Sequence, residues 1–173
     1  MHSAGTFAGL PALNNVNDED KKMSFFNKVK GAFNSSREEL TKQVSRFKNK
    51  KFMQGTVAVC ARIAVASDGV SAEEKQKMIG FLKSSDELKV FDTSEVIDFF
   101  NKLISSFDFD MEIGKGETMK YILALKDQPE AAQLAIRVGI AVGKSDGNFD
   151  PDEQKAVREI AIALGFEPAE FGL

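Results

Sequence analysis

The chain has 173 residues, of which 43% are hydrophobic and 28% are charged, and its formal net charge at pH 7 is −3. This length and composition suit one domain of ordinary size, or two small halves that share a core, and they exclude a generally disordered or fibrous chain. No run of residues approaches the roughly 18 consecutive apolar positions that a membrane-spanning helix needs, which argues against an integral membrane protein.

The scarcity of histidine and cysteine removes several kinds of enzyme site. The one histidine, His2, lies in a tail of small residues, and the one cysteine, Cys60, lies within an apolar run. A Ser/His/Asp triad, a Cys/His pair and a His-ligated zinc site are therefore excluded from the folded part. We expect Cys60 to be a buried apolar side chain and not a reactive thiol, and this cysteine usage fits a reducing cytoplasm.

The charges are divided between two parts of the chain. Residues 21–52 carry ten Lys or Arg and two Glu, a net charge of +8, whereas residues 53–173 carry 13 basic and 21 acidic residues, a net charge of −8. The sequence thus predicts a basic N-terminal arm joined to an acidic body. Residues 1–22 show no helical periodicity, and we expect them to be a disordered leader or an extension that precedes a natural start at Met23.

The basic arm, residues 23–52, has the pattern of two amphipathic helices. Apolar residues recur at helical spacing in residues 24–33 and in a second helix expected over residues 37–49. This apolar face either docks on the acidic body or attaches to an anionic membrane surface. Nucleic acid is not expected as a partner, because the body is acidic and no aromatic side chains interleave with the basic ones. The stripe on the second helix is Leu40, Val44 and Phe47, and the basic residues assigned to docking or membrane contact are Lys28, Lys30, Lys42, Arg46 and Lys48.

Beyond Phe52 nearly every segment has the periodicity of a helix, and the Val- and Ile-rich runs are too long for single strands. Pro129 and Pro151 each stand at a favourable first position of a helix, and Gly165 ends the last long helix. We therefore predict an all-α domain of about seven helices. The helices expected in residues 53–173 cover 53–66, 72–84, 94–107, 117–125, 129–142 and 151–165.

An internal repeat is the most informative feature of the sequence. Residues 53–69 align with residues 131–147 at an offset of 78, so that the tripeptide Ser-Asp-Gly recurs at the end of each copy. Each copy continues with a hydrophobic residue, an N-cap and an acidic helix start. The cap and the following glutamate, Ser71 with Glu74 and Asp150 with Glu153, have the form of a capping box. Residues 53–82 and 131–161 thus form two helical hairpins, which we expect to pack about a pseudo-twofold axis.

This duplication predicts an acidic site, because pseudo-twofold packing would bring Asp68 and Asp146 together. Carboxylates about 4 Å apart repel by about 4 kcal/mol at an effective dielectric constant of 20, so the cluster holds protons, recruits basic side chains or binds a cation. Ligation by oxygen alone favours Ca²⁺ or Mg²⁺. An EF-hand is excluded, because Pro151 replaces its glycine and Val157 its bidentate glutamate. The predicted cation ligands are Asp68, Glu74, Asp146, Asp150 and Glu153, the acids expected to face a partner are Glu73 and Asp152, and the basic residues that would neutralise the cluster instead are Arg62, Lys75 and Lys144.

The Ser-Asp-Gly turns followed by Glu74 and Glu153, the duplicated helical hairpins and the start MSFFNKVKGAF at Met23 resemble the TerB tellurite resistance family over residues 23–173. Acidic turns of this type also occur in the wider group of TerB-like domains, one of which belongs to a membrane-anchored DnaJ-type co-chaperone. The resemblance implies a bacterial origin, an operon-encoded role in stress or metal resistance and an acidic surface. It also implies partner proteins from the same operon, including a membrane component, at the inner membrane.

Three functions from different classes agree with these features. The first is a non-enzymatic cation-binding interaction module in tellurite and oxidative stress resistance, located in the cytoplasm or peripherally at the inner membrane. The second is a purely structural adaptor, in which the acidic residues serve only as helix caps. The third is a metal- or carboxylate-dependent enzyme. We do not expect an enzyme, and direct reduction of tellurite is unexpected because Cys60 is alone and no flavin or haem motif is present.

Overall fold

The computed structural model describes residues 38–67 and 70–173, without the side chains of Glu73, Glu74 and Asp146. These residues belong to one structural unit, Ser36–Leu173. Within the described ranges the regular structure consists of helices, and no strand occurs. The predicted all-α fold is confirmed. No helix in this part of the chain combines the length and the apolar character needed to cross a bilayer.

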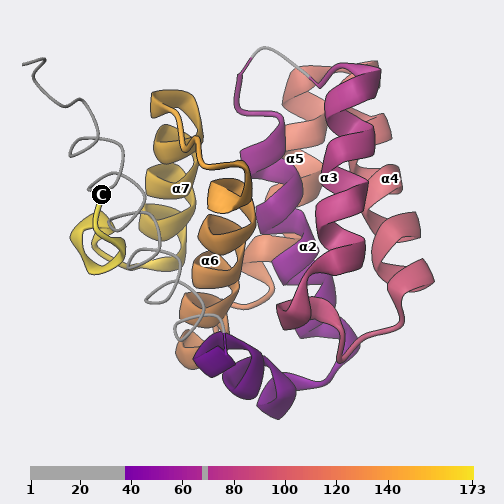
Figure 1. Cartoon of the computed structure of the whole chain (residues 1–173). Coiled ribbons are helices and arrows are strands. Elements are labelled where there is room, and N and C mark those ends of the chain that lie inside the picture. Colours follow the sequence, from indigo (N-terminus) through magenta and orange to yellow (C-terminus); the bar gives the residue numbers. More distant parts are fainter. Residues whose placement is uncertain (1–37, 68–69) are drawn as a thin grey trace, which may run out of the picture. The chain divides into compact units, whose positions relative to one another are not determined.

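The helices follow one another with short connections (Figure 1). Residues 38–44 are helical and continue into the 3₁₀ turn η1 (Ser45–Phe47). The longer helices are α2 (Lys50–Ala64), α3 (Ala72–Ser84), α4 (Thr93–Phe109), α5 (Met111–Leu123), α6 (Pro129–Gly143) and α7 (Pro151–Leu164), and the further 3₁₀ turns are η2 (Asp86–Leu88), η3 (Lys144–Asp146) and η4 (Pro168–Phe171).

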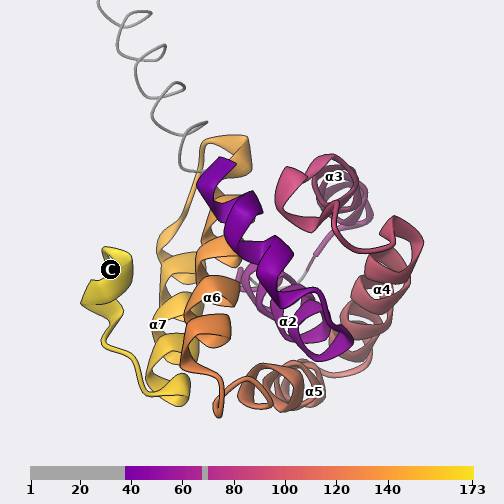
Figure 2. The ribbon, with the colours of Figure 1, turned by 90° about the horizontal axis from the view of Figure 1, so that it is seen from below.

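The central helix of the bundle is α2. Figure 2 looks along the bundle and shows α3, α4, α5 and α6 around α2, with α7 on the far side of α6. This position explains why α2 is apolar on nearly every side: Phe52, Val57 and Val59 are fully buried, and Ile63 is 1% exposed. Burying one such side chain contributes about 1.5–3 kcal/mol, so α2 supplies much of the core.

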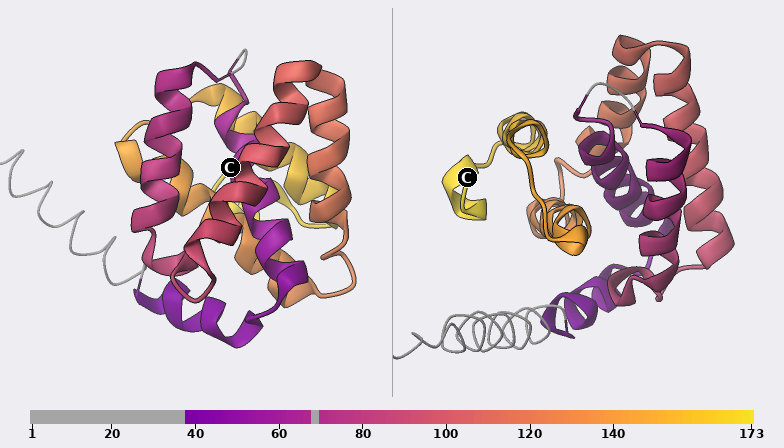
Figure 3. Two further views of the ribbon diagram at one scale, coloured as in Figure 1. Left: turned by 90° about the vertical axis from the view of Figure 1, so that its right-hand side faces the viewer. Right: turned by 45° about the horizontal axis from the view of Figure 1, so that its top comes forward.

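The two apolar helices of the repeat, α2 and α6, pack directly against each other. Gly139 allows their close approach, because a Cβ atom at this position would lie 2.4 Å from Cγ1 of Val59. The second helices of the two hairpins have different neighbours: α7 packs on α2, α5 and α6, whereas α3 packs chiefly on α4. Figure 3 shows the different surroundings of α3 and α7 from two further sides. The pseudo-twofold relation between the hairpins therefore stays a prediction.

The second helix of the basic arm is docked on the body. Val44 is fully buried, and Leu40 and Phe47 pack against the same core. The ring centroid of Phe47 lies 5.5 Å from that of Phe52 in α2. This apolar stripe is thus occupied by the protein's own core. Residues 24–33, with Lys28 and Lys30, lie outside the described residues.

The starts of α2 and α5 show the largest differences from the expected helix boundaries. The arm helix does not reach Asn49, whose Oδ1 accepts a hydrogen bond of 2.9 Å from the backbone N–H of Phe52 and caps α2. Consequently α2 begins at Lys50, ahead of the boundary expected between residues 52 and 53. Helix α5 begins at Met111 and not at residue 117. Asp110 is its N-cap, and Oδ1 of Asp110 accepts hydrogen bonds from the backbone N–H groups of Glu112 and Ile113.

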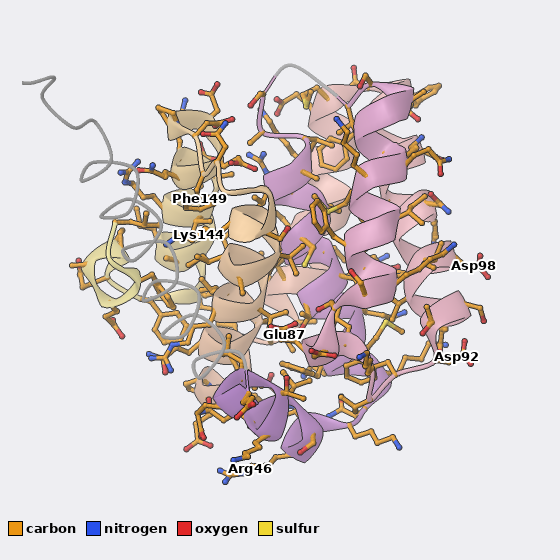
Figure 4. The ribbon with its side chains drawn as sticks, in the orientation of Figure 1. Arg46, Glu87, Asp92, Asp98, Lys144 and Phe149 are labelled. Atoms are coloured by element: carbon orange, nitrogen blue, oxygen red, sulfur yellow. The ribbon has the colours of Figure 1, made fainter. Side chains whose placement is uncertain are left out.

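Cys60 is a core side chain, as expected. It is 1% exposed, and burial raises the pKa of its thiol to about 12, with a further contribution from the negative charge of Glu87. Glu87 is itself fully buried, inside the bundle in Figure 4, and accepts a hydrogen bond of 2.7 Å from the Ser85 hydroxyl. A neutral thiol in this position does not act as a nucleophile.

Candidate functional site: the acidic end of the bundle

The described residues that flank the two acidic turns of the repeat lie close together. Helices α2 and α6 lead into these turns, and their C-terminal ends lie at the same end of the bundle, at the top of Figure 1. The hydroxyl Oγ of Ser67 donates a hydrogen bond of 3.1 Å to Oδ2 of Asp150, the N-cap of α7. The residue that precedes Asp68 is therefore tied to the loop that follows Asp146. Asp68 itself, and the side chains of Glu73, Glu74 and Asp146, lie outside the described part.

The second loop, between α6 and α7, is held by interactions at both of its ends. Gly147 has φ +84°, which favours glycine, and its N–H donates to the carbonyl of Lys144 at 3.0 Å. Phe149 packs across the end of α6, since a Cβ atom on Gly143 would lie 3.2 Å from its ring. The side-chain amide of Gln154 donates to the Phe149 carbonyl at 2.9 Å. Lys144 Nζ lies 5.4 Å from the Phe149 ring centroid, and Figure 4 shows the two residues together beside α6.

The described acidic residues of this loop form the predicted capping box. Asp150 Oδ1 accepts from the N–H groups of Asp152 and Glu153, both at 2.9 Å, and Glu153 Oε2 accepts from the N–H of Asp150 at 2.9 Å. These bonds satisfy amides that a helix N-terminus leaves free, and negative charge there is favoured by the helix dipole. Asp152 is exposed, and its carboxylate has no partner among the described residues.

The basic residues expected to neutralise the cluster have other partners. Arg62 Nη2 lies 2.8 Å from Glu159 Oε2, and Lys75 Nζ lies 3.1 Å from Asp108 Oδ2. Lys144 lies over the Phe149 ring, as described above. These described interactions do not involve the acidic residues of the two turns.

The described side chains contain no group of three or more His, Cys, Asp or Glu residues in the arrangement of a metal site. Of the five predicted ligands, the described side chains include Asp150 and Glu153, which lie together. The side chains of the other three lie outside the described part. The predicted donors are all carboxylates, a donor set that suits Ca²⁺ or Mg²⁺. The carboxylates of Asp150 and Glu153 are therefore suitable ligands for such an ion. The same two side chains also cap the N-terminus of α7.

The basic residues of the arm divide into two groups. Lys50 and Lys51 form ion pairs with Glu95 and Asp127 at 3.7 and 2.9 Å. The hydrogen bond from Lys51 lowers the pKa of Asp127. The second group is exposed and has no ion pair within the described residues; it consists of Lys42, Arg46 and Lys48. Arg46 is labelled at the lower edge of Figure 4, at the opposite end from the acidic turns.

Sequence reasoning missed a hollow beside the second loop. It has a volume of about 170 Å³, and its lining includes Arg62, Lys115 and Lys155. These residues belong to α2, α5 and α7. No local pattern in the sequence could have revealed the hollow, because it forms only when three distant helices pack.

The comparisons with known proteins identify the family of the chain. The sequence model of the family described as "Tellurite resistance protein TerB" matches residues 53–173. The chain belongs to the TerB family. A TerB relative from Alcaligenes sp., named "Tellurium resistance protein TerB", is 86% identical over 119 residues, which cover 69% of this chain and 98% of that protein. No solved structure matches the chain.

Membership of the TerB family supports a role in tellurite resistance. The match begins at residue 53, so it includes both acidic turns and the hollow between α2, α5 and α7. The functional features described above therefore all fall within the TerB region, whereas Lys42, Arg46 and Lys48 precede it.

Proposed function

We propose that this TerB family member is a non-enzymatic module that binds a divalent cation, Ca²⁺ or Mg²⁺, at its acidic end. In this role it presents that end to partner proteins in tellurite and oxidative stress resistance. The supporting observation is the hydrogen bond between Ser67 and Asp150. It joins the residue before Asp68 to the N-cap residue of α7, and this supports carboxylates from both copies of the repeat as ligands of one ion.

The charge around the two turns supports a cation as the ligand. Residues 145–153 contain Asp146, Asp150, Asp152 and Glu153 against no basic residue, and residues 67–74 contain Asp68, Glu73 and Glu74, also without a basic residue. Arg62 and Lys75 are paired elsewhere. A bound cation would remove the repulsion between the two turns and cross-link them. We expect modest affinity, because exposed carboxylates such as Asp152 keep water as a competitor.

The proposal excludes a catalytic role for the groups most often used as nucleophile or base. His2 is the one histidine of the chain, and Cys60 is buried with a raised pKa.

The partners we propose are other proteins of the tellurite resistance operon, including a membrane component, in the cytoplasm or peripherally at the inner membrane. The exposed basic surface of Lys42, Arg46 and Lys48 is the surface for a peripheral membrane contact.

Titration of the full chain with Ca²⁺ and Mg²⁺, followed by calorimetry and by amide NMR, tests the cation site. We expect saturable shifts in the amides of residues 67–74 and 145–153. The variants Asp68→Asn and Asp146→Asn should each weaken binding, and the double variant should abolish it. Asp98→Asn is the matched control, because Asp98 is an exposed acid without a described partner on α4, at the right-hand edge of Figure 4. Unchanged spectra, or equal binding to the double variant, would contradict the cation site.

A purely structural adaptor is the second candidate. Its supporting observation is the capping box of α7, which engages Asp150 and Glu153 without any ligand. In that case Ca²⁺ and Mg²⁺ should leave the amides of both loops unperturbed, and the two Asn variants should capture an operon partner from membranes as the unaltered chain does. This outcome separates the adaptor from the cation-binding module.

A further inference from the structure

We propose that the hollow between α2, α5 and α7 binds a small inorganic oxyanion. Its volume is about 170 Å³, and three basic side chains from three different helices line it: Arg62, Lys115 and Lys155. A water molecule occupies about 30 Å³ in the liquid, so the hollow has room for several waters or for one small oxyanion. This site adjoins the proposed cation site, because Asp152 lines the hollow, but it uses none of the five predicted cation ligands and does not depend on a bound cation.

Arg62 is the central residue of the argument. Its side chain is 9% exposed, and its one described interaction joins Nη2 to Glu159 Oε2 at 2.8 Å. A guanidinium has five N–H donors in a planar fork that matches two oxygens of an anion. A charge that is largely withdrawn from water needs such partners. Arg62 lines the hollow, and no second hydrogen bond of its guanidinium is described, so its other donors remain available to an anion.

The two lysines supply additional positive charge at the same hollow. Lys155 is exposed and has no partner among the described residues. Lys115 Nζ lies 2.7 Å from Glu112 Oε1, and its side chain is 38% exposed. Lysine is a mobile point charge on a flexible stem, so both can turn toward an ion that Arg62 holds. Like charges from three helices around a small volume repel one another, and an anion between them relieves this repulsion.

Two carboxylates at the hollow, Asp152 and Glu159, restrict the ligand. They leave a net charge of +1 among the five charged lining residues, enough for a small anion but unfavourable for an extended acidic peptide. Glu159 also occupies part of the Arg62 fork. Glu159 therefore competes with the ligand. Removing its charge should strengthen anion binding, whereas removing a basic residue should weaken it.

The experiment is an amide NMR titration of the metal-free full chain with sodium sulfate, selenite and tellurite, at an ionic strength kept constant with NaCl. Sulfate is included because it does not react with thiols. We expect saturable shifts at residues 62–66, 111–115 and 152–159. Lys155→Gln should weaken binding by roughly two- to fivefold, and Arg62→Gln by more than about tenfold. Glu159→Gln should tighten it, because a competing acceptor and a negative charge are removed.

The control is Lys126→Gln, which removes an exposed lysine without a described partner beyond the other end of α5. This variant should bind as the unaltered chain does. Lys155→Gln keeps the test decisive if Arg62→Gln folds poorly. Two results with the unaltered chain would overturn the proposal: amide shifts that NaCl alone reproduces, or acetate binding as tightly as the inorganic ions. Two results with the variants would also overturn it: an equal change in anion affinity for Lys155→Gln and Lys126→Gln, or weaker anion binding by Glu159→Gln.

Discussion

Single glycines decide how closely the helices approach α2. Gly139 faces Val59, and Gly55 in α2 faces Leu125, whose Cδ1 would lie 2.5 Å from a Cβ atom at position 55. Val59 and Leu125 are both fully buried, so neither side chain has free space into which it can move. Glycine at these positions is a requirement of the packing, although in an isolated helix alanine would be preferred.

The first prediction concerns Gly139→Ala. Overpacking a core costs about 1–3 kcal/mol, and alanine regains about 1 kcal/mol of helix propensity, so we expect the free energy of unfolding to fall by up to about 2 kcal/mol. Urea denaturation measures this change. Gly116→Ala is the control, because no atom lies within 4 Å of its Cβ position; it should raise the free energy of unfolding by about 0.5–1 kcal/mol. A similar rise in both variants would show that the α2–α6 contact is not tight.

The second prediction concerns Cys60, whose folded-state pKa is about 12. In the unfolded chain the thiol titrates near 8.5. Above that pH the unfolded state loses the proton while the folded state keeps it, so stability is retained below about pH 8.5 and falls as the pH rises toward 12. Urea denaturation from pH 7 to pH 10.5 should show a steeper loss of stability for the unaltered chain than for Cys60→Ala. The thiol should also resist DTNB until the protein unfolds; prompt labelling of the folded protein at pH 8 would contradict its burial.

At the scale of helices, side-chain caps set the starts of four of the six longer helices. Helices α2, α4, α5 and α7 are capped by Asn49, Asp92, Asp110 and Asp150. The starts at Pro129 and Pro151 were predictable because proline favours the first helical position. The start of α5 was not, because Gly114 and Gly116 lower the helix propensity of residues 111–116. Gly114 is needed there since a Cβ would lie 2.3 Å from the Phe107 ring, a contact that no local pattern reveals.

The third prediction concerns the cap of α7. Asp150→Ala removes the acceptor for two backbone amides and for Ser67, and we expect it to lower the free energy of unfolding by about 1–2 kcal/mol. Asp150→Asn keeps an acceptor at the cap and should cost less than about 0.5 kcal/mol. Denaturation by urea without divalent cations measures both. Equal losses for the two variants would mean that the charge of Asp150, and not its hydrogen bonds, stabilises the loop.

At the scale of the whole molecule, the charge separation read from the sequence is partly neutralised by contacts within the fold. Lys50 and Lys51 pair with Glu95 and Asp127 and so belong to the body. The basic surface that remains in the described part consists of Lys42, Arg46 and Lys48. It adjoins a helix whose apolar face is already buried, so membrane contact by this surface would be electrostatic and not insertive.

The fourth prediction follows from that distinction. The full chain should co-sediment with vesicles that contain anionic lipid, and it should be released at high salt, because each Lys or Arg near such a surface contributes about 1 kcal/mol. The triple variant Lys42→Gln, Arg46→Gln and Lys48→Gln should bind more weakly. A triple change of Lys83, Lys102 and Lys126 to Gln has the same loss of charge elsewhere and should bind as before. Equal binding to neutral vesicles would contradict an electrostatic contact.

The candidate site was only partly predictable from the sequence, for a physical reason. The acidic turns and the capping box are local patterns, and the order of their residues was enough to find them. The bond from Ser67 to Asp150 and the hollow around Arg62 join residues that are far apart in the chain. Their formation depends on how α2, α5, α6 and α7 pack, which the periodicity of one helix at a time does not specify.

The position of α2 has a mechanical consequence. Its 15 residues span about 22 Å, with the arm packed against its first turn through Phe52 and Ser67 just beyond its last. A hydrogen-bonded helix transmits an axial displacement without shortening, and the close contacts at Gly55 and Gly139 keep this one from sliding past its neighbours. A displacement of the arm should therefore tilt α2 as a whole and so move its C-terminal end as well. We therefore expect the basic surface and the acidic end to move together.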